Sequence, residues 1–191
     1  MFTIGIYANR RSEVLGFFTG RKVRGYPAEY GDCIVGENYK VPNDLIENTF
    51  RIVKELNYSG IAEFEYKQDG RTKEFKLIEI NPRAWSWIGI TPYCGVNLPL
   101  IAYKDMVGIK NGPVNPRNDE SGSVKYVKIY QDFANCLFRY KRTFPAWNMS
   151  YAKWKESILA EKVIYAELHR KDLLVSLVSI VYLILKLMGK K

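Results

Sequence analysis

Residues 60–83, GIAEFEYKQDGRTKEFKLIEINPR, decide the fold of this chain. Two strand-like runs flank a polar stretch around Asp69 and Gly70, which predicts an antiparallel hairpin with its turn there. Four positions where a strand normally carries apolar residues are polar in these runs: Glu63, Glu65, Glu79 and Asn81. Because side chains alternate between the two faces of a strand, each run presents its polar pair on one face. The hairpin brings the two pairs opposite or diagonal to one another, within cross-strand reach.

This arrangement outlines a site for a hard cation. Mg²⁺ prefers oxygen ligands, keeps several waters and is typically held by one or two carboxylates together with substrate phosphates. The alternative for Glu63 and Glu65 is a plain solvated strand face, which is common on antiparallel sheets. The second run favours the metal site, because Leu77, Ile78 and Ile80 indicate a core-facing strand that Glu79 and Asn81 interrupt. Buried carboxylates need partners. Which of Glu63 and Glu65 is the first ligand depends on the hairpin register, so both remain candidates.

The same residues resemble a known family. The strings GIAEFEYK and EINPR, with fourteen positions from Glu65 to Glu79, look like the C-terminal half of ATP-grasp carboxylate-amine ligases. The upstream string FTGRKVRGYP and the downstream string GVNLPLIAYKDMVG also resemble the branch that includes predicted amino-acid and D-aspartate ligases. The resemblance runs from about Glu13 to Gly108. It implies an α+β fold, with a mainly antiparallel sheet and helices on one face, and ATP-dependent joining of a carboxylate to an amine through an acyl phosphate.

The resemblance also implies roles for individual residues. Glu65 and Glu79 resemble the two acidic Mg²⁺ ligands, with Mn²⁺ as the alternative metal, and Asn81 resembles the third protein oxygen. Glu63 competes with Glu65 for the first position. Arg83 resembles the motif arginine that stabilises charge on the transferring phosphoryl group and on the acyl phosphate. The basic residues expected to bind the phosphates of ATP are Lys22, Arg21 and Lys67, and Lys22 is also expected to act in catalysis.

The length of the chain departs from the family pattern. An ATP-grasp enzyme holds its nucleotide between two α+β subdomains, which takes roughly two conventional domains or more, and this chain has 191 residues. It contains neither a GxxxxGK[ST] phosphate loop nor a GxGxxG motif, and nothing in it resembles the other subdomain. We therefore expect half of a nucleotide clamp: a fragment, a split gene product completed by a separate chain that supplies the N-terminal half, or a relic.

Composition and charge indicate a globular domain with an anionic partner. The chain is 47% apolar and 26% charged, both ordinary values for a folded protein. Its net charge of +9 fits an anionic partner, such as ATP, an anionic lipid surface or a nucleic acid, and equally fits a diffuse basic surface without such a partner. No nucleic-acid motif accompanies the scattered lysines and arginines. Cys33, Cys94 and Cys136 lack the spacing of zinc sites and disulfide frameworks. We therefore expect a reducing, cytoplasmic location and no nucleic-acid ligand.

The rest of the chain predicts the order of the elements. We expect two strands, a long loop and an amphipathic helix in the N-terminal part, at residues 1–7, 13–18, 20–36 and 42–56. Gly108 to Gly122 is rich in turn-forming residues, which predicts a linker. It divides an ATP-grasp-like domain, 1–108, from a linker and mainly helical extension, 109–191, which begins with a short strand at 124–129.

The tail of the chain carries an apolar run. Residues 173–185 are thirteen consecutive residues without a charged side chain. A helix that spans a bilayer needs about twenty apolar residues, so this run predicts a packed or interfacial helix. Residues 173–188 are the candidates for peripheral contact with a membrane.

These observations predict a partial ATP-grasp ligase that acts on a small-molecule carboxylate and a small-molecule amine. The alternative is a non-catalytic basic module that binds anions or a membrane surface. The ligase predicts Mg²⁺-dependent nucleotide binding centred on Glu65 and Glu79, whereas the basic module predicts salt-sensitive binding that depends on neither.

Overall fold

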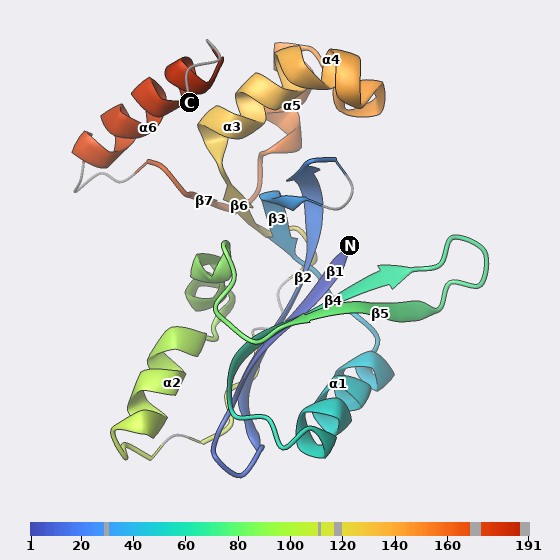
Figure 1. Cartoon of the computed structure of the whole chain (residues 1–191), viewed down its shortest axis with the longest axis vertical. Helices are drawn as coiled ribbons and strands as arrows, with labels where there is room; N and C mark the ends of the chain where they lie inside the picture. Colours follow the sequence, from blue (N-terminus) through green and yellow to red (C-terminus); the bar gives the residue numbers. More distant parts are fainter. Residues whose placement is uncertain (29–30, 111, 117–119, 169–172, 188–191) are drawn as a thin grey trace.

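The computed structural model describes residues 1–28, 31–110, 112–116, 120–168 and 173–187. The described strands form one seven-stranded sheet in the order β5-β4-β1-β2-β3-β6-β7 (Figure 1). Neighbouring strands are antiparallel, except that β6 and β7 are parallel. The strands are β1 (Phe2–Ala8), β2 (Val14–Tyr26), β3 (Asp32–Asn38), β4 (Gly60–Gln68), β5 (Phe75–Asn81), β6 (Val124–Val127) and β7 (Lys162–Tyr165). The predicted α+β class with a mainly antiparallel sheet is confirmed.

The helices lie between and after these strands. They are α1 (Asn43–Glu55), the 3-10 helix η1 (Ile88–Cys94), α2 (Leu98–Met106), α3 (Ile129–Ala134), the π-helical turn η2 (Asn135–Arg139), α4 (Tyr140–Thr143), the 3-10 turn η3 (Pro145–Trp147), α5 (Tyr151–Ser157) and α6 (Leu173–Leu187). The helix predicted at 42–56 is confirmed, with Pro42 and Leu56 as its cap residues. The strand predicted at 124–129 ends at Val127, and α3 begins two residues later.

The long loop predicted at 20–36 is wrong. Strand β2 continues to Tyr26, and β3 begins at Asp32. Gly20, the first residue of the predicted loop, lies inside the sheet, where a Cβ would come 2.7 Å from the carbonyl oxygen of Glu37 and the same distance from the Phe18 ring. This glycine is therefore required by the close approach of neighbouring groups rather than by a turn.

Different helices cover the two faces of the sheet. Ile4 and Ile6 of β1 pack with Leu45 of α1 on one face, whereas Tyr7 of β1 packs with Ile101 of α2 on the other. Figure 1 shows α1 and α2 on opposite sides of the strands. The sequence predicted helices on one face; α1 lies on that face, and α2 and η1 cover the opposite one.

The C-terminal half is tied to the same sheet. Its strands β6 and β7 extend the sheet beyond β3, and α3 to α5 cover a third buried cluster that includes Val35 of β3 and Trp154 of α5. At the centre of this region the guanidinium of Arg24 donates two hydrogen bonds of 2.8 Å to the carboxylate of Asp132. The indole of Trp154 donates a third, of 2.9 Å. The division into domains 1–108 and 109–191 stays a prediction.

The hairpin of β4 and β5 has the predicted turn but a different outer strand. The Asp69 side chain accepts hydrogen bonds from the backbone of Arg71 and Thr72, which holds the turn. Leu77 and Ile78 are 40% and 55% exposed, so the expectation that they face the core is wrong. The reason is the position of β5 at the edge of the sheet, together with a register shift between Glu65 and Tyr66. Ile80, which was also expected to face the core, does pack against the buried cluster on the α1 side.

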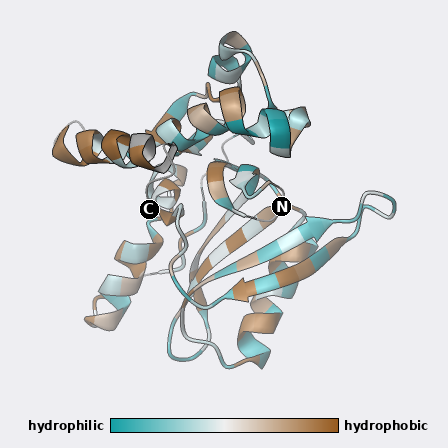
Figure 2. Ribbon diagram, turned by 45° about the horizontal axis from the view of Figure 1, so that its top comes forward, coloured by the Kyte–Doolittle hydropathy of each residue, from teal (hydrophilic) through white to brown (hydrophobic). Residues whose placement is uncertain are grey.

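The apolar run in the tail forms helix α6, which Figure 2 shows as a largely apolar ribbon. Its serine at position 176 is buried and donates a hydrogen bond of 2.8 Å to the carbonyl of Glu167. Leu174, Leu177 and Val181 are 70%, 60% and 56% exposed. Within the described ranges, no helix has the length and apolar content needed to cross a membrane. Residue 188, the last of the proposed membrane contact, lies outside the described residues.

Candidate active site

A cavity of about 280 Å³ lies beside the β4–β5 hairpin, on the face of the sheet opposite α1. Six predicted site residues line it: Lys22, Glu63, Glu65, Glu79, Asn81 and Arg83. In the register of the hairpin, Glu63 is paired with Asn81 and Glu65 with Glu79. Directly paired residues share a face and have Cβ atoms about 4.5–5.5 Å apart. The structure therefore brings together the two polar pairs in the opposed arrangement, and β2 adds Lys22 to them.

Glu65 is held by a cation at the floor of this cavity. The ammonium of Lys22 lies 2.7 Å from Oε1 of Glu65, and both side chains are largely buried. The amide of Asn81 donates a longer hydrogen bond, of 3.4 Å, to the same oxygen. Burial opposes the charge on Lys22, but the hydrogen bond and the charge of Glu65 outweigh it and raise the pKa of Lys22. The two groups therefore form a charged pair at neutral pH.

Glu63 is buried beside this pair and behaves differently. Its side chain is 3% exposed, and the hydroxyl of Thr3 donates a hydrogen bond of 3.2 Å to Oε1. Burial raises the pKa of Glu63 to about 7, which the positive charge of Lys22 opposes and the negative charge of Glu65 reinforces. At neutral pH the cavity floor therefore holds the ion pair of Lys22 and Glu65 beside Glu63, which is partly protonated.

The outer part of the cavity is open to solvent. Glu79 and Arg83 are exposed, whereas Asn81 is buried between them and the floor. The guanidinium of Arg83 donates to the carbonyl of Ala84 at 3.2 Å and makes a long contact of 3.5 Å with Oδ1 of Asn81. Neither contact is with a carboxylate, so Arg83 keeps a positive charge available at the mouth of the cavity.

Arg21 and Lys67 do not line this cavity. The Nε atom of Arg21 lies 2.7 Å from Glu37, and its guanidinium covers the ring of Tyr39. In the sheet, Arg21 is paired with Phe2, whose side chain packs against the α1 side, so Arg21 lies on the opposite face from the cavity. Lys67 lines a neighbouring cavity of about 160 Å³, which it shares with Lys22.

Several residues of the cavity were not predicted from the sequence. Asp32, Trp85, Ser86 and Trp87 line it, and Thr3 contacts Glu63 from below. Burial opposes ionisation of Asp32, but hydrogen bonds from Lys128 and Ser86 outweigh it and lower its pKa. The indole N–H of Trp87 lies near Glu63 and slightly offsets the rise in the pKa of Glu63. It makes no hydrogen bond of normal geometry with any described residue. Trp85, Ser86 and Trp87 belong to the string AWSW, which directly follows EINPR in the sequence, whereas Asp32 lies in the predicted loop at 20–36.

The donor set fits a hard cation that arrives with phosphate oxygens. Glu65, Glu79 and Asn81 offer carboxylate and amide oxygens, which are the ligands that Mg²⁺ prefers. Within the described part of the chain, however, no three His, Cys, Asp or Glu residues form a preformed metal site. Lys22 already neutralises Glu65. The residues therefore fit a metal that is bound together with a nucleotide better than a free ion.

A family comparison covers the hairpin and its flanks. Residues 35–129 match the family model described as ATP-grasp in the biosynthetic pathway with Ter operon. These residues belong to an ATP-grasp domain. The ATP-grasp segment includes eight of the cavity residues, from Glu63 to Trp87, whereas Lys22 precedes it and joins them only through the sheet. No curated protein matches the chain.

Two solved structures with partial similarity are much longer than this chain. Campylobacter jejuni biotin carboxylase in its β-γ-ATP complex is 15% identical over 54% of this chain and 24% of its own, with a TM-score of 0.47. Rhizobium etli pyruvate carboxylase is 20% identical over 51% of this chain and 9% of its own, with a TM-score of 0.44. The matched part of this chain thus spans about a quarter or less of these proteins.

Proposed function

We propose that this chain supplies the C-terminal half of an ATP-grasp ligase that joins a small-molecule carboxylate to an amine with ATP and Mg²⁺. The observation that carries the proposal is the cavity in which Lys22, Glu65 and Arg83 meet around an ATP-grasp hairpin. The finer assignment, to the branch with predicted amino-acid and D-aspartate ligases, is part of the proposal and rests on the sequence resemblance.

The proposed reaction has two steps. An oxygen of the substrate carboxylate attacks the γ-phosphorus of ATP, which forms an acyl phosphate and releases ADP. The amine nitrogen then attacks the acyl carbon, phosphate leaves, and the amine loses a proton. Phosphoryl transfer of this kind depends mainly on positioning and charge neutralisation.

Each charged residue of the cavity would have a separate role in this reaction. Glu65, Glu79 and Asn81 would hold Mg²⁺, which when bound neutralises charge on the phosphates. Arg83, at the mouth, would bind two phosphoryl oxygens through its planar guanidinium. Lys22 would move from Glu65 to the phosphates when the nucleotide arrives, so its charge stays neutralised in both states.

The second part of the proposal is that this chain alone is an incomplete enzyme. Nothing on this half would close over the nucleotide and exclude water, so turnover would require the N-terminal half, either from a separate chain or from the rest of a longer protein. The proposal therefore predicts nucleotide binding by the 191-residue chain but little or no ligase turnover.

Calorimetric titration of the full chain tests the nucleotide site. ATP should bind more tightly with Mg²⁺ than without it, and free Mg²⁺ should bind weakly, because the metal site is completed by phosphate oxygens. Glu79→Gln should remove this dependence, whereas Glu74→Gln, in the exposed hairpin turn, should keep it. Equal affinity for ATP with and without Mg²⁺ would exclude the proposed metal site. Robust ADP release with an amine acceptor by the chain alone would exclude the half-clamp.

A second candidate function is binding to an anionic membrane surface, and helix α6 favours it. Leu174, Leu177 and Val181 are exposed on this helix, whereas the buried Ser176 is on the side that meets the protein. The sequence places Lys186 in this helix, and the chain carries a net charge of +9. Exposed apolar side chains combined with basic residues are typical of helices that lie in the membrane interface.

Flotation with lipid vesicles tests this candidate. The chain should float with vesicles that contain phosphatidylserine and much less with phosphatidylcholine alone, because the electrostatic attraction requires anionic lipid. The double variant Leu174→Gln with Leu177→Gln should lose binding. The control is Leu159→Gln, which changes a leucine that is 60% exposed away from α6. Flotation that is unchanged in the double variant would contradict the role of this helix.

A further inference from the structure

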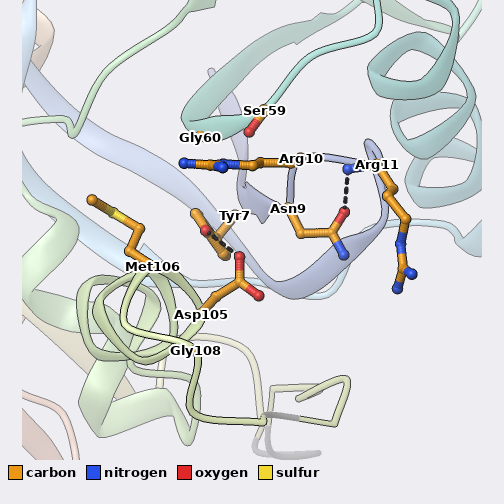
Figure 3. Close-up of a pocket in the computed structure, with 9 residues that line it drawn as sticks. All are labelled: Tyr7, Asn9, Arg10, Arg11, Ser59, Gly60, Asp105, Met106 and Gly108. Carbon is orange, nitrogen blue, oxygen red and sulfur yellow. Dashed lines mark hydrogen bonds between the residues drawn. The ribbon is translucent and has the colours of Figure 1, made fainter.

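A second cavity, of about 590 Å³, lies where the β1–β2 turn meets the start of β4 and the end of α2. Figure 3 shows Arg10 on one side of this cavity and Asp105 on the other, with Tyr7 between them. The cavity therefore presents one cationic and one anionic side chain around an aromatic ring. Neither the metal-site prediction nor the proposed ligase reaction uses these residues.

This cavity is separate from the carboxylate cavity. The two share no lining residue. Gly5 and Tyr7 lie on the same face of β1 by alternation, and Trp85 covers Gly5 so closely that a Cβ there would lie 2.0 Å from its ring. Trp85 lines the carboxylate cavity and packs in the same buried cluster as Tyr7. The tryptophan thus stands between two sites on one face of the sheet.

The anionic side of the cavity is fixed in place. The hydroxyl of Tyr7 donates a hydrogen bond of 2.8 Å to Oδ2 of Asp105. Burial, followed by this hydrogen bond, raises the pKa of Tyr7 to about 12, so the hydroxyl remains a donor throughout the neutral range. Among the described residues, Oδ1 of Asp105 accepts no hydrogen bond. One carboxylate oxygen therefore remains available to a ligand.

The cationic side is the turn between β1 and β2. Asn9 organises it by accepting hydrogen bonds from the backbone of Arg11 and Glu13, and the Arg11 guanidinium pairs with Glu13 at 2.9 Å. Arg10, by contrast, makes no hydrogen bond or ion pair with any residue that the structure describes. Its charge acts on Tyr7 in the opposite direction and only partly offsets the rise in the pKa of that residue. Figure 3 shows the Arg10 guanidinium above the Tyr7 side chain. The turn thus directs an unneutralised cation to the cavity.

We infer that this second cavity binds a small zwitterion of the α-amino acid class, with its carboxylate on Arg10 and its ammonium on Asp105. A guanidinium offers two parallel N–H groups to a carboxylate, and the available oxygen of Asp105 accepts from an ammonium. A simple anion is disfavoured by Asp105 and a simple cation by Arg10. Met106, which is 80% exposed at the rim, offers an adaptable apolar contact for a side chain. The inference is independent of the proposed function, because binding here requires neither nucleotide nor metal.

Titration of the full chain by ¹H–¹⁵N NMR tests the inference, with glycine, L-leucine and L-glutamate as zwitterionic probes, and acetate and methylamine as the two separated charges. At least one amino acid should shift the amide signals of Arg10, Gly60 and Asp105 with a dissociation constant of about 1 mM or tighter. Arg10→Gln and Asp105→Asn should each weaken this binding tenfold or more. Asparagine keeps an acceptor for the Tyr7 hydroxyl, so the second variant tests charge rather than packing.

Arg11→Gln is the matched control, since it removes the same charge one residue away from a guanidinium that Glu13 already neutralises. It should change the affinity by less than twofold. Saturable shifts that both single variants abolish, with acetate and methylamine at least tenfold weaker, would establish the site. Acetate that binds as tightly as the amino acids would overturn the inference in favour of a plain anion site. The absence of shifts with all three amino acids, or equal binding by Arg10→Gln, would overturn it outright.

Discussion

The ammonium of Lys22 lies 2.7 Å from the carboxylate of Glu65, although the two residues are 43 positions apart in the chain. Strand β1 lies between them in the sheet, since β2 and β4 flank it. Glu65 is paired with Thr3 of β1, and Lys22 reaches it from the other side of that strand. This pair places a permanent positive charge where the proposed Mg²⁺ and nucleotide phosphates would bind. Binding of Mg²⁺ with the nucleotide must therefore replace the Lys22 ammonium beside Glu65 with the metal ion.

Removing the charge of Lys22 should have opposite effects on the free metal and on the metal–nucleotide complex. Lys22→Met leaves Glu65 without its cation, so free Mn²⁺ should bind about tenfold more tightly, whereas MgATP should bind about tenfold more weakly because a phosphate contact is lost. Water proton relaxation measures Mn²⁺ binding, and calorimetry measures MgATP binding. Lys76→Met is the control, since Lys76 pairs with Asp69 in the exposed part of the hairpin. Parallel changes in both affinities would contradict the exchange.

The raised pKa of Glu63 should make stability depend on pH in a defined direction. The ordinary pKa of 4.5 is raised to about 7 in the folded protein, so between these values the folded state binds more protons than the unfolded state. The contribution of protonated Glu63 is therefore complete below pH 4.5 and is lost as the pH rises through about 7.

Glu63→Gln removes this titration while keeping an acceptor for Thr3. Between pH 5 and pH 8, the free energy of unfolding of the wild type should fall by about 2 kcal/mol relative to the variant, as measured by urea denaturation. Glu55→Gln, at the exposed end of α1, should show the wild-type dependence. Parallel pH profiles for the wild type and Glu63→Gln would show that Glu63 is ionised in the folded protein at both pH values.

Arg83 should be required for turnover once the N-terminal half is supplied. Lysine keeps the charge but loses the planar pair of donors, so Arg83→Lys in the reconstituted complex should lower turnover about a hundredfold, a few kcal/mol, with little change in MgATP affinity. Arg71→Lys, in the exposed turn of the hairpin, should be neutral. Near wild-type turnover in Arg83→Lys, with an unchanged circular dichroism spectrum, would remove this residue from the mechanism.

The buried pair of Arg24 and Asp132 should hold the helical half on the sheet. The two side chains are 4% and 0% exposed, so Asp132→Ala leaves a buried guanidinium without its counter-charge. Such a loss costs about 3–5 kcal/mol, which urea denaturation would detect as a large fall in the midpoint. Glu161→Ala, an exposed acidic residue before β7, should change stability by less than about 0.5 kcal/mol. A small effect of Asp132→Ala would mean that water reaches Arg24.

The amino-acid sequence by itself determined the local parts of this protein. Alternation along residues 60–83 predicted the hairpin and the faces of Glu63, Glu65, Glu79 and Asn81, and the spacing of apolar residues predicted α1. These predictions succeed because strand alternation, turn residues and helical periodicity act over a few residues. The same local reasoning wrongly predicted a loop from residue 20, because a glycine needed for close packing inside a sheet has the same sequence signal as one in a loop.

Only the tertiary structure decided what meets across the sheet. The order of the strands places β2 and β4 on either side of β1 and so brings Lys22 to Glu65. The edge position of β5 exposes Leu77, and packing of the C-terminal helices joins Asp132 to Arg24, 108 residues away. The cavity of Arg10 and Asp105 likewise depends on how α2 packs against β1. Such contacts depend on strand pairing and burial between distant segments, and no local pattern of residues encodes them.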